Sequence, residues 1–161
     1  MQNFSLEITP PSKMYIILSM ANLYRYDLSE FTHWNVEDDG MHRCYGLEIY
    51  WVNDNLPFLI YVEGELAGFV LIKKEENSYE IGEFFILRKF RRTGLATTVI
   101  LELFKRYKGV WIIQQLPANK PALQFWEKIL KEYTQNNFEE ETLMDDEVGE
   151  MCVMKFSNKD N

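Results

Sequence analysis

Cysteine and histidine are scarce in this chain, which contains two of each among its 161 residues. The cysteines, Cys44 and Cys152, lie far apart in the sequence and do not make a disulfide framework or a metal-binding cluster. We therefore expect both thiols to be reduced, as thiols are in cytosolic proteins. The histidines, His33 and His42, lack the companion ligands that a metal centre needs, so the sequence predicts no metal site.

A long apolar run and an excess of positive charge are also missing. No stretch reaches the roughly 18 apolar residues that cross a bilayer, and the first residues lack the basic and apolar segments of a signal peptide. Acidic residues outnumber basic ones by 25 to 17, for a net charge of −8. Non-specific nucleic-acid binding requires the opposite sign. We accordingly expect a cytoplasmic protein that binds neither membranes nor nucleic acid.

What the chain does contain is enough apolar material for one core. Apolar residues make up 47% of the sequence and aromatic residues 15%, which argues against disorder. The length suits one domain, and no repeat, linker or low-complexity tract divides it. The sequence therefore predicts a single domain over residues 1–161.

The spacing of the apolar residues predicts the order of the secondary-structure elements. We expect a strand at 3–8, a helix to about residue 26, a second short helix from 27–30, a hairpin of strands 58–62 and 67–73, a strand at 79–87, a helix at 93–107, a strand at 110–113, a helix at 119–131, and a final hairpin of 133–142 and 148–156. This order predicts an α/β fold with a mixed sheet of about six to seven strands and helices on both faces.

A short basic segment, 88–92, stands out in this acidic chain because four of its five residues are Arg or Lys. Small residues and the start of the predicted helix follow it. A helix start offers unpaired N–H groups and a positive dipole end, small residues let a phosphate approach, and arginines add charge-assisted bonds. The segment therefore predicts a pyrophosphate site, although a solvated turn rich in arginine would look similar. It is neither a Walker loop nor a Rossmann fingerprint.

The segment 91–96 reads Arg-x-x-Gly-x-Ala, which resembles the Q/R-x-x-G-x-G/A signature of the GNAT superfamily of N-acetyltransferases. Its surroundings are also similar to that family, because a strand precedes it and an amphipathic helix and a short strand follow it. The later segment 119–125, Asn-x-x-Ala-x-x-Phe, resembles the family's next motif. The resemblance implies the GNAT fold over nearly the whole chain, with acetyl-CoA as the acyl donor and no metal.

The resemblance also implies where acetyl-CoA binds. The pantetheine arm would lie between two splayed parallel strands, the pyrophosphate on the backbone N–H groups of the basic loop, and an asparagine and an aromatic ring against the arm. The residues assigned to the cofactor in this way are Ile86, Leu87, Arg91, Arg92, Thr93, Gly94, Leu95, Ala96, Thr97, Asn119 and Phe125.

Direct acetyl transfer to an amine needs a base, because an amine with a pKa of about 10.4 arrives protonated. Glu80 and Glu83 both lie on the strand that ends at the predicted cofactor site. Glu80 falls at the position that histone-acetylating members use, whereas Glu83 lies closer to the acyl group, where burial would raise its pKa. The two face opposite sides of the strand unless a bulge intervenes. We favour Glu83; a chain of water molecules is the remaining alternative.

One position departs from the family pattern. Trp126 stands where the family often has a tyrosine that protonates the leaving thiolate, and an indole N–H is not a useful acid. Tyr133 is a candidate substitute. The thiolate can also leave without help, because a thiol pKa is about 8.5.

The acceptor is expected to lie against residues 24–50, which are rich in acids and aromatics and so suit a cation. This wall would consist of Tyr26, Asp27, Glu30, Phe31, His33, Trp34, Asp38 and Asp39. The primary expectation is therefore acetylation of the primary amine of a small cationic molecule. Acetylation of a protein lysine or N-terminus, and a non-catalytic acyl-CoA sensor, are the alternatives. The sequence leaves a homodimer open.

Overall fold

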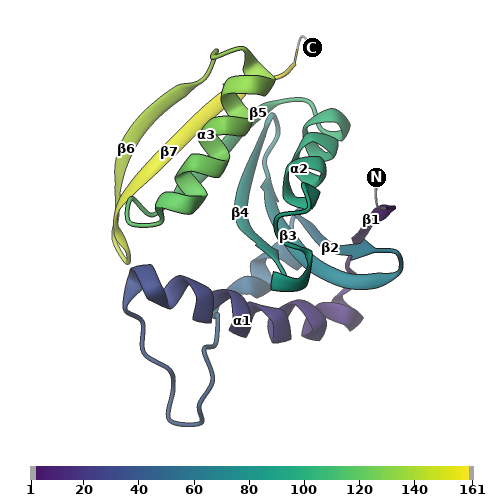
Figure 1. Ribbon diagram of the computed structural model, residues 1–161, viewed down its shortest axis with the longest axis vertical. Coiled ribbons are helices and arrows are strands. Elements are labelled where there is room, and N and C mark those ends of the chain that lie inside the picture. The colour runs from purple at the N-terminus through teal and green to yellow at the C-terminus, as the bar shows by residue number, and fades with distance from the viewer. Residues whose placement is uncertain (1–2, 160–161) are drawn as a thin grey trace.

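The computed structural model describes residues 3–159 and shows a mixed sheet of seven strands with helices on both of its faces (Figure 1). The strands are β1 (Phe4–Ile8), β2 (Leu56–Val62), β3 (Glu65–Lys74), β4 (Ser78–Ile86), β5 (Val110–Gln115), β6 (Glu139–Asp145) and β7 (Gly149–Ser157). The helices are α1 (Met14–Thr32), α2 (Leu95–Arg106) and α3 (Lys120–Thr134), with short 3-10 turns η1 (Pro11–Lys13), η2 (Leu47–Trp51) and η3 (Arg88–Phe90). The predicted α/β fold class is confirmed.

The sheet order is β1-β2-β3-β4-β5-β7-β6. Every neighbouring pair is antiparallel except β4 and β5, which run parallel. The connection between these two strands is α2, as expected because parallel strands need a crossover rather than a tight turn. The start of α2 therefore lies at the end of β4.

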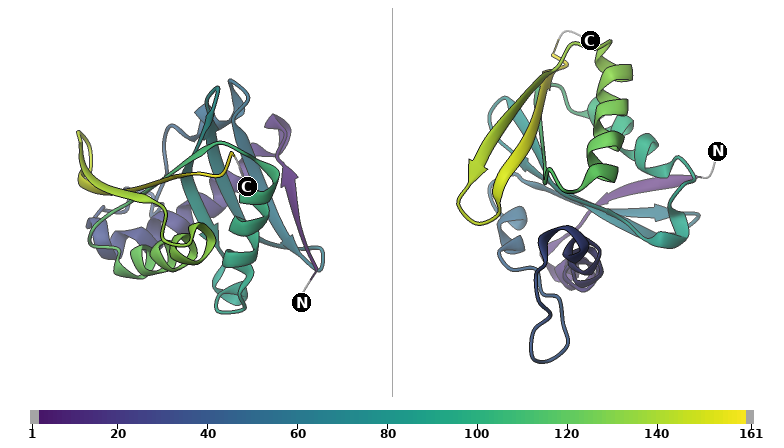
Figure 2. Two further views of the ribbon diagram at one scale, coloured as in Figure 1. Left: turned by 90° about the horizontal axis from the view of Figure 1, so that it is seen from above. Right: turned by 60° about the vertical axis from the view of Figure 1, so that its left-hand side comes forward.

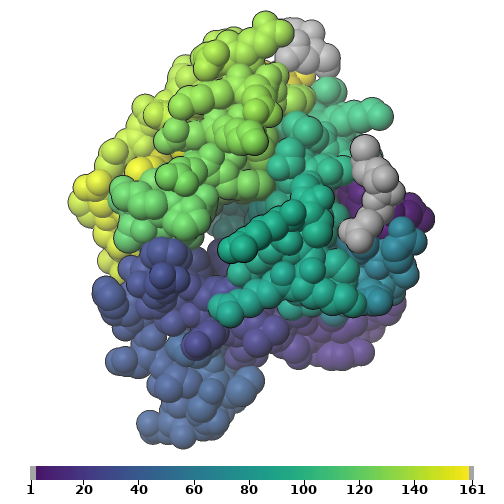
Figure 3. Space-filling view, in the orientation of Figure 1, coloured from purple at the N-terminus to yellow at the C-terminus, as the bar shows by residue number. Residues whose placement is uncertain are grey.

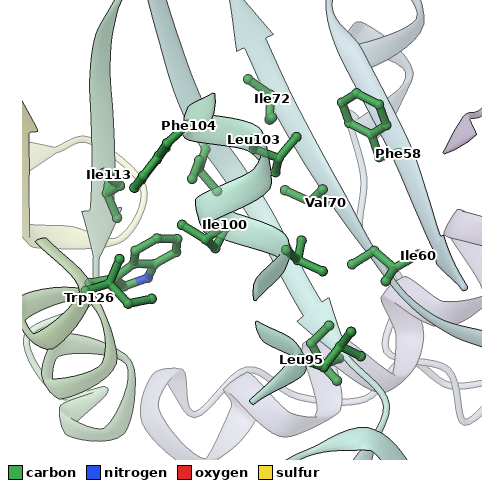
Figure 4. Close-up of a cluster of buried hydrophobic side chains, with 14 of the residues drawn as sticks. Phe58, Ile60, Val70, Ile72, Leu95, Ile100, Leu103, Phe104, Ile113 and Trp126 are labelled. Carbon is green, nitrogen blue, oxygen red and sulfur yellow. The ribbon is translucent and has the colours of Figure 1, made fainter. Parts of the chain in front are cut away.

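The helices lie on opposite faces of the sheet, with α1 on one face and α2 and α3 on the other (Figure 2). An apolar cluster fills the space on each face. The larger cluster lies between the sheet and the pair α2 and α3. Figure 4 shows Ile100 and Leu103 of α2 and Trp126 of α3 in this cluster with strand residues such as Ile113. The smaller cluster joins α1 and η2 to the other face through residues such as Ile17 and Phe69. Each helix is thus held by the apolar stripe that its sequence periodicity predicts.

Some element boundaries differ from the prediction. The helix α1 continues without interruption to Thr32, so the separate short helix expected from 27–30 is wrong. Its partly apolar face simply continues, and the helix ends at His33 with a left-handed φ of 57°. The helix α3 extends to Thr134, so the strand expected at 133–142 begins only at Glu139.

An irregularity in β4 determines the shape of the centre of the molecule. Glu83 pairs with Leu71 of β3, but Ile81 pairs with Ile72, so Gly82 is an extra residue that makes a β-bulge. The parallel pairing of β4 with β5 ends at the same place, with Ile81 opposite Ile113. Beyond it the two strands separate, and β5 continues against β7 alone.

Within residues 3–159, no helix combines the length and the apolar character that crossing a membrane requires. Cys44 and Cys152 are free thiols.

Candidate active site

A cavity of about 1070 Å³ lies where β4 and β5 separate. Its lining comes from both sides of the sheet, with α1 on one side and α2 and α3 on the other. In the space-filling view a recess lies where these helices meet (Figure 3). The β6–β7 hairpin also lines the cavity, through Val148 in its turn and Met151 near the start of β7. The gap between the strands therefore joins two compartments into one cavity, which suits a reaction between two substrates that enter from different sides.

Glu83 is partly buried and lines this cavity. Burial raises the pKa of Glu83 to about 7, although a hydrogen bond with Tyr24 and the positive charges of Lys73 and Arg25 act in the opposite direction. A carboxyl group with a pKa near neutrality exchanges a proton readily at physiological pH, as a general base must. Glu83 thus has the properties that the sequence argument required of it.

Glu80 is placed differently, although the bulge brings both carboxylates to the same face of β4. Both carboxylates lie near Tyr50 of η2, on that face. Burial is the main cause that raises the pKa of Tyr50, and the negative charges of Glu83 and Glu80 raise it further. Glu80 lies outside the cavity lining and forms an ion pair with Lys73 at 3.6 Å. The geometry therefore favours Glu83 over Glu80 as the candidate base.

Gly82 is the residue that lets the bulge lie against η2. A Cβ atom at this position would stand 1.7 Å from the Tyr50 hydroxyl oxygen. Only 4% of the Tyr50 surface is exposed, so its ring has little room to move away. The contact explains why this position of β4 is a glycine, and it couples the bulge to the smaller core.

The basic loop after β4 is tied to α1 by an aspartate. The Asp27 carboxylate accepts a hydrogen bond from Arg88 at 2.8 Å and a second one from Arg91. The Arg91 Nε donates to the Ile86 carbonyl oxygen at 2.7 Å, and the guanidinium lies 5.3 Å from the Phe85 ring centroid. Arg91 therefore joins the end of β4 to α1, and its side chain is largely engaged by the protein itself.

Arg92 and the start of α2 form the part of the loop that remains open. Arg92 and Gly94 have left-handed φ values of 63° and 84°, and Arg92 and Ala96 line the cavity. Gly94 is the N-cap of α2 and offers no side-chain cap, and Thr93 Oγ1 accepts a bond from the Leu95 N–H at 3.4 Å. The remaining N–H groups of the first turn of α2 have no partner within the helix and can bind an anion.

The other cofactor residues predicted in this region are divided between cavity and core. Leu95 is buried in the larger core, and Thr97 lies outside the cavity lining. The Leu87 N–H donates to the Ala67 carbonyl oxygen at 2.8 Å, so it faces β3. Because successive residues of a strand alternate in direction, the Ile86 N–H faces the gap between β4 and β5, whereas the Ile86 carbonyl oxygen accepts the bond from Arg91. Ile86, rather than Leu87, is placed to bond a ligand there.

The second motif lies across the cavity on α3. The Asn119 side chain caps this helix by accepting a bond from the Ala122 N–H at 3.2 Å, and both residues line the cavity. Phe125 also lines it, with its ring centroid 6.2 Å from that of Phe84. Trp126 belongs to the larger core, with 2% of its surface exposed, but reaches the cavity wall as well.

Tyr133 does not reach the cavity. Its hydroxyl oxygen accepts a bond from Asn158 Nδ2 at 3.3 Å, and its ring packs against Phe104 and Phe156. The suggestion that Tyr133 replaces the family's acid is therefore wrong. The cavity-lining residues of α3 end at Trp126, whereas Leu130 and Tyr133, farther along the helix, pack in the larger core.

The acceptor wall contains part of the expected set. Tyr26, Asp27, Glu30, Phe31 and Trp34 line the cavity, whereas His33, Asp38 and Asp39 do not. The last two belong to the segment 33–46, which projects from the body below α1 (Figure 1). The expectation for these three residues is wrong because α1 continues past residue 26 and carries them away from the cavity.

Other residues of the site were missed in the sequence. Tyr24 lines the cavity and contacts Glu83; it begins the region 24–50 expected to contact the acceptor, but it was not named among the residues of that wall. Gln114 and Gln115 line the cavity from the end of β5, and Met151 from β7. No local pattern marks these positions, because they become neighbours only when β5 separates from β4.

The Asp27 contacts lead to a stability prediction. Burial alone would raise the pKa of Asp27, but hydrogen bonds from Arg91 and Arg88 hold it below its usual value. The ionised carboxylate therefore stabilises the fold above the ordinary carboxyl pKa, and this contribution is lost as the pH falls through the lowered value. We expect Asp27→Asn to reduce stability at pH 7 by about 1–2 kcal/mol, between the values for exposed and buried pairs. Chemical denaturation should show the difference shrink below pH 4; an equal difference at pH 3 and pH 7 would contradict it.

Comparisons with known proteins agree with this architecture. The model of the acetyltransferase (GNAT) family matches residues 20–131. No curated protein sequence matches the chain.

Several solved structures share the fold. A GNAT acetyltransferase from Streptococcus agalactiae is 14% identical, with a TM-score of 0.67 over 96% of this chain and 95% of that one. An aminoglycoside acetyltransferase in complex with coenzyme A is 14% identical, with a TM-score of 0.66 over 98% and 96%. The ribosomal-protein-S18-alanine N-acetyltransferase from Escherichia coli is 13% identical, with a TM-score of 0.62 over 96% and 94%.

At these identities the structural likeness shows the fold, whereas the match of the family model covers most of the chain. The matched residues include the parallel pair β4 and β5 and the helix start that follows β4. This chain therefore belongs to the GNAT family of acetyltransferases.

Proposed function

We propose that this protein transfers the acetyl group of acetyl-CoA to a primary amine, with Glu83 as the general base. The observation that carries the proposal is the single cavity that joins both faces of the sheet through the gap between β4 and β5. Glu83 lies on the wall of that cavity with its pKa raised to about 7 by burial. Two substrates can meet there with a proton acceptor beside them.

Acetyl-CoA fits the side of the cavity that α2 and α3 line. Arg92 and the first-turn N–H groups of α2 would hold the pyrophosphate, Asn119 and Phe125 would contact the pantetheine arm, and the Ile86 N–H faces the gap. Acetyl-CoA supplies an activated thioester whose sulfur is a fair leaving group. Arg91 would contribute less direct charge than the motif suggests, because Asp27 and the Ile86 carbonyl already engage it.

The other steps belong to side chains of this protein. Glu83 would take a proton from the substrate ammonium group before the nitrogen attacks. The Ile86 N–H, which faces the gap, is a candidate donor to the oxygen on which negative charge develops. Trp126 offers no acid, so we propose that the thiolate leaves without a protein proton donor.

The acceptor follows from the α1 side of the cavity. Two of the structural relatives bear the names of an aminoglycoside and of a ribosomal-protein-alanine acetyltransferase, so the family accommodates small molecules and polypeptides. We propose a small amine with a positive charge, because aromatic side chains and Glu30 surround this compartment. A polypeptide acceptor or a sensor without catalysis remain the competing functions.

The first experiment measures the binding of acetyl-CoA by calorimetry. Ala96→Glu places a carboxylate at the proposed pyrophosphate position, where it should weaken binding about 100-fold or more. The helix should remain intact, because glutamate is favourable in a first helical turn. Leu101→Glu, on an exposed part of the same helix, is the matched control. Equal affinities of the wild type and both variants would show that the pyrophosphate does not bind at α2.

A further inference from the structure

The cavity carries a different charge from the rest of the protein. The chain has a net charge of −8, but the charged residues that line the cavity are three acids and three arginines. The acids are Asp27, Glu30 and Glu83, and the arginines are Arg88, Arg91 and Arg92. An acceptor with several positive charges would therefore not find here the acidic surface that the composition suggests.

Asp27 in particular is already neutralised. Both of its oxygens accept bonds from arginines, Oδ1 from Arg88 at 2.8 Å and Oδ2 from Arg91. Only 21% of its side chain is exposed, so no free edge of the carboxylate is left for a substrate ammonium. Two of the three acids of the projecting segment 33–46 are also engaged, because Arg43 pairs with Glu37 at 2.8 Å and with Asp39. Among the described residues of the cavity wall, Glu30 and Glu83 are the acids outside an ion pair.

Apolar and aromatic side chains dominate the rest of the α1 side. They are Tyr24, Tyr26, Leu28, Phe31, Trp34, Phe85, Val148 and Met151. Two of these rings are held firmly, since the Tyr24 centroid lies 5.9 Å from that of Phe69 and 5.7 Å from that of Phe85. Ordered rings of this kind bind an apolar body of similar size and can also face one cation.

From this wall we infer that the acceptor is a primary monoamine carried on an apolar, aromatic-sized body, such as an arylalkylamine. The inference rests on the proposed acetyl transfer and specifies its substrate class. One ammonium group is matched by Glu83, and the apolar body is matched by the aromatic wall. Glu30, the other unpaired acid, is exposed, and its charge acts on the Arg88 guanidinium. A second or third ammonium, as in a polyamine or an amino sugar, would therefore have to compete with Arg88 for Glu30 and would be repelled by Arg88 and Arg91.

The test compares two amines of similar size, 2-phenylethylamine and spermidine. Equilibrium dialysis against the protein saturated with CoA measures acceptor binding without turnover. We expect 2-phenylethylamine to bind at least about tenfold more tightly, and kcat/KM with acetyl-CoA to follow the same order. Tighter or equal binding of spermidine would overturn the inference, as would the absence of 2-phenylethylamine binding at millimolar concentration.

Two variants locate the effect in the wall. Phe31→Ala should weaken 2-phenylethylamine binding about tenfold, whereas Tyr15→Ala, an exposed aromatic on α1 away from the cavity, should not. Arg88→Gln frees one oxygen of Asp27 and should move the preference toward spermidine. An unchanged affinity in Phe31→Ala would place the amine elsewhere and refute the assignment. Failure of the proposed function is recognised separately, because acetyl-CoA would then not bind or not turn over while amine binding persists.

Discussion

Replacing Glu83 by glutamine is expected to lower kcat by about 10²–10⁴-fold, the usual contribution of a positioned base. Glutamine keeps the size of the side chain and a group that can accept a bond from Tyr24, so the acetyl-CoA Kd should not change. The measurement is the release of CoA at pH 7 with a saturating amine. Glu80→Gln is the comparison, because that carboxylate pairs with Lys73 outside the cavity. A larger loss in Glu80→Gln would reverse the assignment of the base.

The pH dependence of the wild type follows from the same group. The base acts when it is ionised, and burial raises the pKa of Glu83 to about 7. The value of kcat/KM should therefore rise as the pH increases through about 7. This rise in the pH–rate profile should disappear in Glu83→Gln. The charged and titratable groups around Glu83 are Tyr24, Arg25, Cys44, Tyr50, Lys73 and Glu80. If kcat/KM of the variant still rises near pH 7, the titrating group is one of these neighbours or the substrate, and not Glu83.

The loss of activity in Glu83→Gln should come with a gain in stability at high pH. Burial raises the pKa of the Glu83 carboxyl to about 7, whereas the pKa of an exposed glutamate is 4.5. Between these two pH values the folded protein therefore binds the proton more tightly than the unfolded chain does. Stability from this group is therefore present at low pH and falls as the pH rises toward the folded pKa. We expect the variant to be more stable than the wild type at pH 8 by about 1–3 kcal/mol and equally stable at pH 4. Denaturant unfolding at the two pH values measures this.

The second large effect is expected from Gly82→Ala. The new Cβ would lie 1.7 Å from the Tyr50 hydroxyl oxygen, and overpacking of a buried contact costs about 1–3 kcal/mol. Because the bulge at this residue also turns Glu83 toward the cavity, kcat should fall about tenfold or more through misplacement of the base. Thermal melting and steady-state kinetics measure the two effects.

A second substitution tests the stated cause. Tyr50→Phe removes the hydroxyl oxygen, after which the nearest atom to the new Cβ is the ring carbon that lies 2.8 Å away. Gly82→Ala combined with Tyr50→Phe should therefore recover part of the lost stability, so the two changes should not be additive. Additive losses would mean that Gly82 matters for its backbone conformation and not for the contact with Tyr50.

The order of the secondary-structure elements and the family could both be predicted from the sequence, because both depend on local patterns. The hydrophobic spacing of α2 and α3, the helix start after the basic loop and the asparagine cap of α3 are each contained in a short stretch of chain. Local pattern failed at the end of α1, which continues to Thr32. There the long-range contact is that of Asp27 with Arg88 and Arg91, which no local pattern contains.

Tertiary structure decided the chemistry of the site. Whether Glu80 or Glu83 reaches the cavity depends on a bulge whose register is set by the partner strand β3 and by Tyr50 of η2. Which charges are free depends on pairs such as Asp27 with Arg88 and Arg91, which are 61 and 64 residues apart in the sequence. A charge count treats Asp27 as an acid that attracts cations, whereas the fold places two guanidinium groups on it. Local sequence thus determined that a basic loop and a helix start follow a strand. Only the packing of α1 against the end of that strand determined which charged side chains line the other side of the cavity.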